Sequence, residues 1–323
     1  MAATTTPLTN AGPARPAPSF WERLRSGDEI AIGITFLCAF SIIAVTAYLV
    51  WELWINSALP REKFGWHFLF TQTWDPVVGD FGALPFIYGT LVTSAVALII
   101  AVPLGVGSAI FLAELAPPML SDALAFMIEL LAAVPSVIYG LLGIFILVPA
   151  LRVIQPSIKA ALGWSPLFSG PFYGVSLFSA GVVLSVMIVP FIISISREVI
   201  RAVPNDQREA ALALGATRWE TVWDAVLPFA NKGIAGSIFL ALARSLGETM
   251  AVTMVVGNDP KIKASLFAPG YSIAAVIANE FTEATGALYT QSLIELGLVL
   301  FALTIVINGL ARLMIAASER GRA

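Results

Sequence analysis

Charged side chains are scarce in this chain of 323 residues, where Asp, Glu, Lys and Arg together make up 12%. Soluble globular proteins carry about 25% charged and about 45–50% apolar residues, whereas this chain is 58% hydrophobic. Its 18 basic and 21 acidic side chains cannot cover the surface of a water-soluble protein of this length. The composition therefore excludes a soluble enzyme as the default and predicts a protein whose main solvent is lipid.

Cysteine and histidine are almost absent. The single cysteine, Cys38, lies in an apolar run and excludes an internal disulfide, and the single histidine, His67, excludes a multi-histidine zinc site. We expect both side chains to fill packing and loop positions, and we expect neither a metal nor a cofactor. The small net charge of −3 and the lack of a strong basic run give no indication of a nucleic-acid partner.

Two further absences bear on catalysis. No Gly-x-x-x-x-Gly-Lys-Ser/Thr loop occurs, so we do not expect this chain to bind ATP through a Walker cradle. No set of nucleophile, base and orienting group stands out. The chain is therefore not expected to be an enzyme, and energy for any work it does must come from another subunit or from a gradient.

Long apolar runs dominate what is present. A helix needs about 20 apolar residues to cross a bilayer, and inside lipid it satisfies its own backbone hydrogen bonds. Six segments meet this requirement: 29–52, 84–113, 123–151, 172–196, 230–256 and 289–315. The third is long enough to be tilted, or broken around Pro135 and Gly140. The sequence predicts an all-α integral membrane protein with six transmembrane helices.

The distribution of Lys and Arg orients these spans. With both termini in the cytoplasm, eleven basic residues fall in inside segments and six in outside segments, as the positive-inside rule requires. We predict a flexible cytoplasmic tail over 1–28, a first transmembrane helix over 29–52 and an extracytoplasmic loop over 53–83. A five-helix core over 84–316 and a cytoplasmic tail over 317–323 follow.

One cytoplasmic excursion, 197–229, is large enough to dock a partner. Pro204-Asn205-Asp206 is a start signal for a helix of strong helix formers that ends at Gly215. A second short helix fits Thr217 to Val226, because Thr217 and Glu220 have the spacing of a capping box. Leu227-Pro228 is expected to end this second helix.

This excursion resembles the EAA loop of ABC-importer permeases. The resemblance is carried by Glu209-Ala210-Ala211, then three residues, Gly215, and finally Leu227-Pro228. It departs from the family pattern at Ala225, where Ile is usual. In that family the loop forms coupling helices that sit in a cleft of the ATP-binding subunit, so the resemblance implies this role for these six residues. The alternative is an amphipathic hairpin of a polytopic protein without a coupling function.

The fifth predicted span contains two charges. Arg244 and Glu248 are four residues apart, which in a continuous helix puts them on one face. A charge at mid-bilayer costs about 2.5–3.5 kcal/mol on insertion scales, so such residues face a bundle interior or a wet path. We hypothesise that Arg244 attracts phosphate and Glu248 accepts the proton that phosphate, unlike sulfate, still carries. The alternative is a structural ion pair.

A second resemblance follows from these residues. The segment 244–252 reads Arg-Ser-Leu-Gly-Glu-Thr-Met-Ala-Val and is similar to the fifth-span signature of phosphate-specific ABC permeases of the PstC type, rather than their PstA-type sisters. The stretches 103–114 and 135–143 agree with this family. The resemblance covers about residues 30–316 and implies the type I ABC importer permease fold, with Arg244, Glu248 and Thr249 on the substrate pathway.

The resemblance also implies partners and a location. A homologous PstA-type permease would enclose the path with this chain, an ATP-binding subunit dimer would drive it, and an extracytoplasmic phosphate-binding protein would deliver inorganic phosphate. The expected location is the bacterial inner (cytoplasmic) membrane. Two rivals remain: a permease for another oxyanion such as sulfate or molybdate, and a secondary transporter that uses Arg244 and Glu248 for ion coupling. A membrane-embedded enzyme has no support beyond the buried charge.

Glycine and proline in the second and third spans have a structural interpretation as well. Pro135 removes a backbone donor, and Gly140 and Gly143 remove side-chain bulk, which predicts a kink and close helix approach. Pro103, Gly105 and Gly107 in the second span are interpreted in the same way. For these residues we expect packing at least as much as contact with a transported substrate.

Overall fold

A computed structural model describes residues 28–320, and side chains are described up to residue 313. The expected tail 1–28 therefore falls outside the described residues except for Asp28, which already begins a helix. The expected end of the core at residue 316 is not observed, because the last helix runs on to Arg320. Residues 321–323 of the expected C-terminal tail also lie outside the described part.

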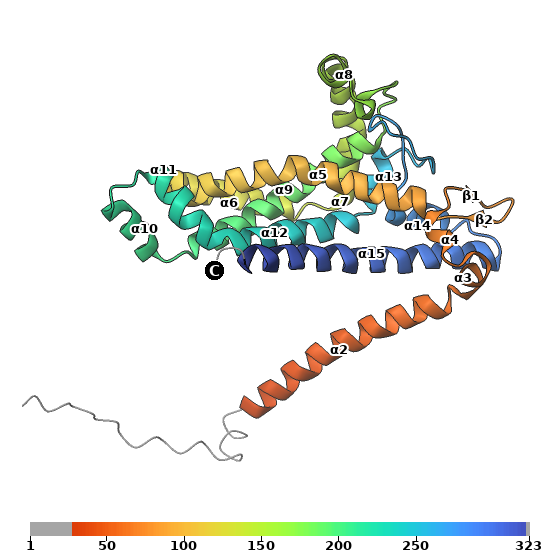
Figure 1. Cartoon of the computed structure of the whole chain (residues 1–323), viewed down its shortest axis with the longest axis horizontal. Helices are drawn as coiled ribbons and strands as arrows, with labels where there is room; N and C mark the ends of the chain where they lie inside the picture. The colour runs from red at the N-terminus through yellow and green to blue at the C-terminus, as the bar shows by residue number, and fades with distance from the viewer. Residues whose placement is uncertain (1–27, 321–323) are drawn as a thin grey trace, which may run out of the picture. The chain divides into compact units, whose positions relative to one another are not determined.

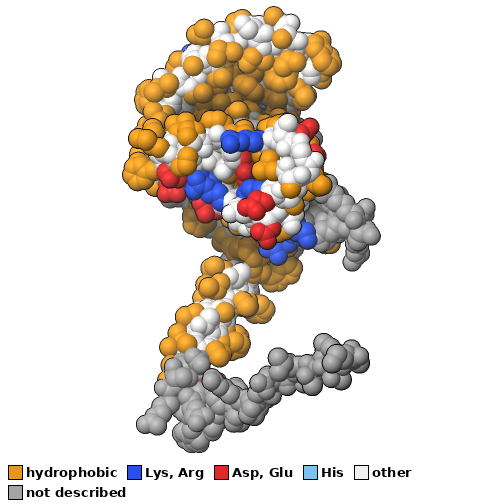
Figure 2. Space-filling view, turned by 90° about the vertical axis from the view of Figure 1, so that its left-hand side faces the viewer, with side chains coloured by type: hydrophobic (Ala, Val, Ile, Leu, Met, Phe, Trp, Pro, Cys, Tyr) orange, Lys and Arg blue, Asp and Glu red, His pale blue; other side chains and the backbone are white. Residues whose placement is uncertain are grey.

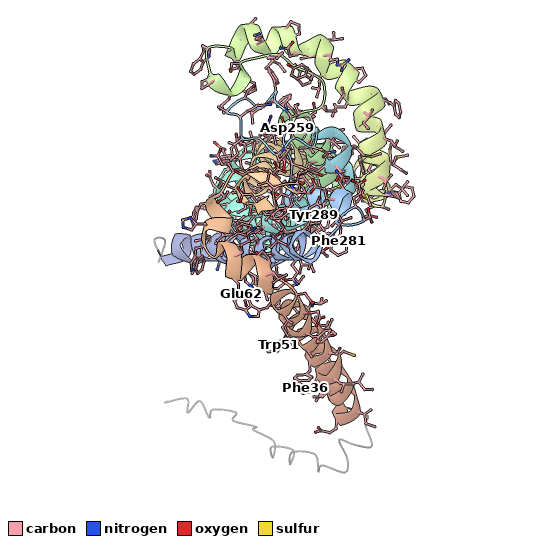
Figure 3. The ribbon with its side chains drawn as sticks, turned by 90° about the vertical axis from the view of Figure 1, so that its right-hand side faces the viewer. Phe36, Trp51, Glu62, Asp259, Phe281 and Tyr289 are labelled. Atoms are coloured by element: carbon pink, nitrogen blue, oxygen red, sulfur yellow. The ribbon has the colours of Figure 1, made fainter. Side chains whose placement is uncertain are left out.

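The chain divides into two units, Met1–Glu52 and Leu53–Ala323. The described part of the first unit consists of α2 (Asp28–Ile55), which continues three residues into the second. The hydroxyls of Thr35, Ser41 and Thr46 each donate to a carbonyl three or four residues back, at 2.7–2.8 Å. Phe36 and Trp51 point away from the α2 ribbon (Figure 3). The helix thus satisfies its serine and threonine hydroxyls internally and presents apolar groups outward, as suits a lipid-spanning helix.

The described part of the second unit is mostly helical and contains a short antiparallel hairpin in which Trp74 pairs with Phe81. Its elements are α3 (Ala58–Phe64), α4 (His67–Phe70), β1 (Trp74–Asp75), β2 (Asp80–Phe81), α5 (Leu84–Ile110), η1 (Phe111–Leu115), α6 (Pro118–Ala132), α7 (Ser136–Leu142), η2 (Gly143–Leu147), α8 (Val148–Leu162), η3 (Pro166–Phe168), α9 (Leu177–Arg201), α10 (Asn205–Ala213), α11 (Arg218–Glu220), η4 (Thr221–Val226), α12 (Leu227–Leu246), α13 (Met250–Val255), α14 (Ile273–Glu280) and α15 (Ala287–Arg320). Here η1, η2 and η4 are π-helical, and η3 is a 3₁₀ turn.

Six helical segments among the described residues are long and apolar enough to span a membrane, as the sequence predicts. The third differs in position: it runs over Ser136–Leu162, because Pro135 separates α6 from α7 where a break was expected. The fifth also differs and runs over Arg218–Leu246. Figure 1 shows α5, α9, α12 and α15 side by side, with α10 and α11 at one end of this bundle and α3, α4 and α14 at the other.

Helix α9 lies at the centre of the bundle and packs against α5, α6, α12 and α13. Lipid gives helices no hydrophobic reason to associate, so small residues that allow close approach carry the packing. Ala97 and Ala101 of α5 and Ala180 of α9 are completely buried between these helices. At Gly105 of α5, an added Cβ would lie 2.7 Å from Cγ2 of Ile192 in α9. The packing interpretation of Gly105 is therefore confirmed.

Two further apolar clusters stabilise the ends of the bundle. At the end that carries the hairpin, the ring of Trp74 contacts those of Phe81 and Phe86 edge-on at 4.8 Å between centroids. Burial raises the pKa of Tyr271 in this cluster, so its phenol stays protonated. At the other end, Ile200 and Val226 are completely buried, and their cluster joins η4 and α12 to α5 and α9. Both ends of the second unit thus have cores of their own.

Gly105→Ala tests the close approach of α5 and α9. We expect it to lower the free energy of unfolding by about 1–3 kcal/mol, because the added methyl overlaps Ile192. Gly107→Ala is the matched control: it lies in the same helix, and nothing lies within 4 Å of its added Cβ. This control should be neutral or stabilising through better helix propensity. Thermal unfolding of the purified protein measures the stability of both variants. An equal loss of stability in Gly105→Ala and Gly107→Ala would contradict the packing argument.

Candidate functional site

The predicted cytoplasmic excursion forms two short helices joined at a glycine. Helix α10 contains Glu209, Ala210 and Ala211 and has no buried residue. Gly215 adopts φ +91°, a left-handed conformation that side chains disfavour, and nothing lies within 4 Å of an added Cβ. The capping box is confirmed: the hydroxyl of Thr217 accepts from the Glu220 amide at 3.3 Å, and the Glu220 carboxylate accepts from the Thr217 amide at 2.7 Å.

The second helix does not end at Leu227-Pro228, and this expectation is wrong. The short helix α11 passes through the π-helical segment η4 into α12 without interruption. Pro228 falls in the first turn of α12, directly after the π-helical turn η4, and such a local change of helix type accommodates a residue without an amide hydrogen. The loop is therefore continuous with the fifth span, and a displacement of its helices acts directly on that span.

Large apolar side chains of this loop are exposed. Leu214 is 91% exposed and Leu212 is 48% exposed. Trp219 and Trp223 stack with their ring centroids 6.0 Å apart, and both are more than half exposed. Figure 2 views this end of the molecule and shows apolar groups among clustered basic and acidic side chains. Exposed aromatic groups with a charged rim are typical of a protein–protein interface.

An ion pair ties α10 to the end of the second span. The guanidinium of Arg208 donates to the Glu114 carboxylate, with Nη2 at 2.6 Å and Nε at 3.2 Å from Oε1. It also donates to the carbonyl of Ile200 at 2.9 Å and to that of Val203, both near the end of α9. Both charged side chains are less than a fifth exposed. One side chain thus links α10, η1 and α9.

A second charged cluster holds the start of α6. Arg197, 6% exposed, donates to Asp122 at 2.9 Å and to the hydroxyl of Ser121 at 3.2 Å. Arg201 donates to the same hydroxyl at 3.0 Å, and Ser121 itself donates to the carbonyl of Leu112 at 2.6 Å. The turn between the second span and α6 contains no Lys or Arg. Its carboxylates instead neutralise arginines of α9 and α10.

The chain leaves the helical conformation in the middle of the predicted fifth span. Helix α12 ends at Leu246, Gly247 caps it, and α13 begins only at Met250. Glu248 Oε1 accepts from the Ala251 amide at 3.3 Å, which satisfies a donor in the first turn of α13. The expectation that Arg244 and Glu248 share a face of one continuous helix is therefore wrong.

Arg244 and Glu248 do not form an ion pair in the described part of the chain. The Arg244 side chain is exposed, and its Cζ lies 5.9 Å from the centroid of the Phe191 ring in α9. Thr249 donates its hydroxyl hydrogen to the Gly247 carbonyl at 3.3 Å. The three residues proposed for the substrate pathway therefore surround a helix break, and the guanidinium is available for an outside partner.

The third-span glycines hold α13 in place. An added Cβ on Gly140 would overlap Sδ of Met254 and would lie 3.2 Å from Cα of Ala251. At Gly143 it would lie 2.9 Å from Val255 and 2.8 Å from Val183. Gly140 and Gly143 are therefore packing residues, as expected, and they position the helix that follows the break. Gly107 is different, because an added Cβ there would meet nothing.

The partners of the loop could not be read from the sequence. The positive-inside rule counts Arg197, Arg201 and Arg208 among the basic residues of inside segments, but no spacing rule pairs them with Glu114 or Asp122. The available signal was the clustering of arginines beside a short acidic turn in a chain with little charge. No group of three or more metal-ligating side chains occurs among residues 28–313.

Comparisons with known proteins agree with this architecture. Residues 101–321 match the family described as binding-protein-dependent transport system inner membrane component. The phosphate transport system permease protein PstC of Mesorhizobium japonicum is 46% identical over 293 residues, which are 89% of this chain and 90% of that protein. The PstC of Pasteurella multocida is 48% identical over 284 residues, covering 86% and 87%.

A solved structure supports the fold. An inward-facing structure of the MetNI methionine ABC transporter aligns with a TM-score of 0.53 and 16% identity, and the alignment covers 76% of this chain and 99% of that one. At this identity the likeness supports the fold alone, which is the type I ABC importer permease fold that the sequence predicts. This chain belongs to the family of binding-protein-dependent transport system inner membrane components and, within it, to the PstC permeases.

Proposed function

We propose that this chain is a permease subunit of an ATP-driven importer of inorganic phosphate, with both termini in the cytoplasm of a bacterial cell and its spans in the inner membrane. The observation that carries the proposal is the exposed two-helix loop, continuous with the fifth span and fixed by ion pairs, in a chain 46–48% identical to phosphate permeases. Its partners are a PstA-type permease, a dimer of ATP-binding subunits and an extracytoplasmic phosphate-binding protein.

The loop is proposed to receive the movement of the ATP-binding subunits. Glu209, Ala210 and Gly215 are exposed, so a partner can contact them directly. Ala211 is half-buried, and Leu227 and Pro228 join the loop to α12. The Glu114–Arg208 pair then carries a displacement of α10 to the second span, while η4 carries it to the fifth. Rigid-body motion of a packed element is an established way to move spans against each other.

The helix break around Gly247 is proposed to lie on the phosphate path. Arg244 supplies a fixed fork of donors that has no carboxylate partner in the part of the chain that the structure describes, which suits an oxyanion. Glu248 and Thr249 supply acceptors close by in the chain, and monohydrogen phosphate has a proton to donate to them, whereas sulfate has none. A structural ion pair of Arg244 and Glu248 is disfavoured, because the two side chains are not within ion-pair distance in the described residues. In a permease for another oxyanion such as sulfate, sulfate would compete strongly for transport, whereas in a phosphate permease it would compete poorly.

Uptake of labelled phosphate into proteoliposomes containing the whole complex tests the path. We expect Arg244→Gln to reduce uptake by about 10–100-fold, because a hydrogen bond to a charged group contributes about 1.5–3 kcal/mol. Glu248→Gln should reduce the discrimination against sulfate. Full uptake in both variants, with ATPase activity matched to the wild type, would remove these residues from the path. Strong competition by sulfate in the wild type would favour the rival oxyanion.

Gly215→Val tests the coupling loop. The left-handed backbone at Gly215 costs a β-branched residue about 1–3 kcal/mol, and its side chain points to open space where a partner would lie. We expect the variant complex to lose most of its phosphate uptake and to bind its ATP-binding subunits more weakly. Gly236→Val is a comparison for added bulk, because nothing lies within 4 Å of a Cβ there. Normal transport by Gly215→Val at normal expression would contradict a coupling role.

Replacing one member of the Glu114–Arg208 pair tests the link to the second span. Glu114→Gln leaves Arg208 without its anion at a site less than a fifth exposed, so we expect ATP hydrolysis to continue while uptake falls about tenfold, a coupling change of about 1.4 kcal/mol. The double variant that exchanges the two residues, Glu114→Arg with Arg208→Glu, should restore part of the lost phosphate uptake. Glu198→Gln, at a side chain 71% exposed, is the control. An unchanged ratio of phosphate transported to ATP hydrolysed would exclude the pair from coupling.

A further inference from the structure

A groove of about 680 Å³ lies in the second unit, between α15, the start of α5 and the segment 54–70. Its walls are largely apolar and include Trp66, Phe70, Leu298, Ala302 and Val306. Its volume falls within the range of about 300–1,000 Å³ that is usual for small-ligand sites. Trp66 and Phe70 are 81% and 71% exposed, so their rings face outward beside the groove. Such a groove in a membrane-spanning chain can take an acyl chain.

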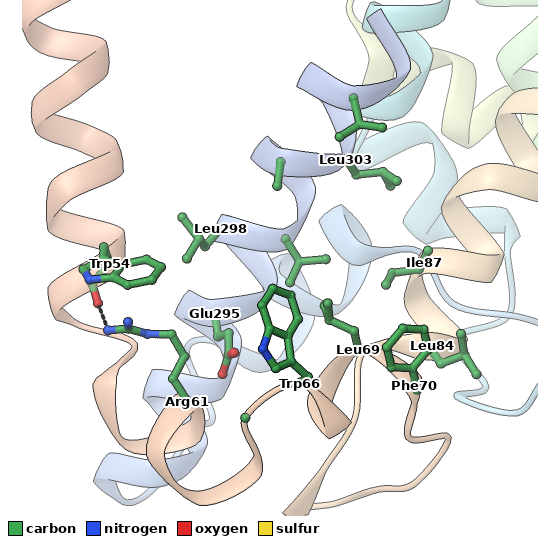
Figure 4. A pocket seen from close by; sticks show the side chains of 14 residues that line it. Trp54, Arg61, Trp66, Leu69, Phe70, Leu84, Ile87, Glu295, Leu298 and Leu303 are labelled. Carbon is green, nitrogen blue, oxygen red and sulfur yellow. Dashed lines mark hydrogen bonds between the residues drawn. The ribbon is translucent and has the colours of Figure 1, made fainter. Parts of the chain in front are cut away.

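Two opposite charges face this groove without pairing with each other. Glu295 of α15 is 6% exposed, and its Oε2 has no hydrogen-bond partner among the described residues. Arg61 of α3 donates from Nε to the carbonyl of Ser57 at 3.1 Å and from Nη2 to that of Trp54, and its Cζ lies 3.7 Å from the centroid of the Trp54 ring. In Figure 4 the side chains of Arg61 and Glu295 lie next to each other, with the Arg61 guanidinium turned toward Trp54 and Trp66 on the other side of Glu295.

The depth of Glu295 can be estimated from the length of α15. This helix has 34 residues, or about 51 Å, while the hydrocarbon core is about 30 Å thick. A centred helix therefore extends about 10 Å beyond the core at each end. Glu295 lies eight residues, or about 12 Å, from the first residue of α15, which places it close to the boundary between hydrocarbon and headgroups. The apolar wall continues from there toward the bilayer centre.

A buried carboxylate at this depth is costly unless a donor reaches it. We propose that this groove is a binding site for a phospholipid whose headgroup carries a primary ammonium, such as phosphatidylethanolamine. The ammonium donates to Glu295, the phosphate accepts from Arg61, and one acyl chain lies along Leu298, Ala302 and Val306. A choline headgroup fits poorly because its quaternary nitrogen has no hydrogen to donate, and a glycerol headgroup offers no positive charge.

Native mass spectrometry of the whole permease complex, stripped of lipid and titrated with lipids of identical acyl chains, tests the proposal. We expect the wild type to retain one phosphatidylethanolamine about tenfold more tightly than phosphatidylcholine, because a charge-assisted hydrogen bond is present only with the former. Glu295→Gln should make the two lipids equal. Arg61→Gln should weaken phosphatidylethanolamine, phosphatidylcholine and phosphatidylglycerol alike.

Matched controls come from the same short helix. Glu62→Gln and Lys63→Gln remove one charge of each sign from α3 at exposed positions that do not line the groove, and both should behave as the wild type. Ala302→Trp fills the groove without touching either charge, and it should abolish retention of the tightly held lipid even if Glu295→Gln fails to assemble.

Equal retention of phosphatidylethanolamine and phosphatidylcholine by the wild type would overturn the proposal. Efficient cross-linking of Val306→Cys to another subunit would also overturn it, since a protein would then occupy the groove.

Discussion

The close approach of α5 and α9 is the contact on which the rest of the second unit depends. In lipid the apolar side chains of a helix gain nothing by leaving the solvent, so association needs close packing and hydrogen bonds. Ala97, Ala101 and Gly105 leave α5 narrow enough for this, with Ile192 filling the space over Gly105. Because α9 also packs against α6, α12 and α13, its position fixes theirs. The ends of α5 and α9 then lie close enough for Glu114 and the α9–α10 arginines to meet.

Charge is scarce in this chain, and most of the charges discussed above have a specific structural place. At the end that carries α10, Arg197, Arg201 and Arg208 are matched by the two carboxylates of one short turn. This arrangement lowers the cost of holding arginines in buried and partly buried positions, and it fixes the segment between η1 and α6 to the loop. Arg244 differs from these three because no carboxylate among the described side chains lies within ion-pair distance of it. An unmatched guanidinium next to a helix break is consistent with the proposed contact with a passing anion.

Local signals predicted local features. The capping box of Thr217 and Glu220, the glycine turn at Gly215 and the break at Pro135 all depend on a few neighbouring residues, and each is present. The number of spans follows from run length alone. The continuation of the helix through Pro228 and the break after Leu246 were missed because they depend on what surrounds the chain there. A π-helical segment precedes Pro228, and α13 packs on Gly140 of α7 and Gly143 of η2.

The contacts of the candidate site were beyond sequence reasoning for the same reason. Glu114 and Arg208 are 94 positions apart, and no spacing rule joins them. Glu295 had a signal that was available, since it is an isolated carboxylate within the last predicted span, where charge is expensive. Its neighbour Arg61 belongs to α3, which is distant in sequence, so their common groove emerges only from the folded chain. The residues of greatest functional interest are therefore those whose partners are distant in sequence.

The two connections of the coupling loop to the spans differ in stiffness, and this difference matters for the proposed mechanism. The link to the second span runs through the Glu114–Arg208 ion pair, with several hydrogen bonds, into the π-helical η1 that contains Glu114, whereas the link to the fifth span is the π-helical η4 alone. A π-helical turn has a wider ring and poorer packing than an α-turn, so it bends more readily. A displacement of α10 would therefore pull η1 through a stiff contact while η4 changes its angle. The second and fifth spans would then move by different amounts, which is what opening a path between spans requires.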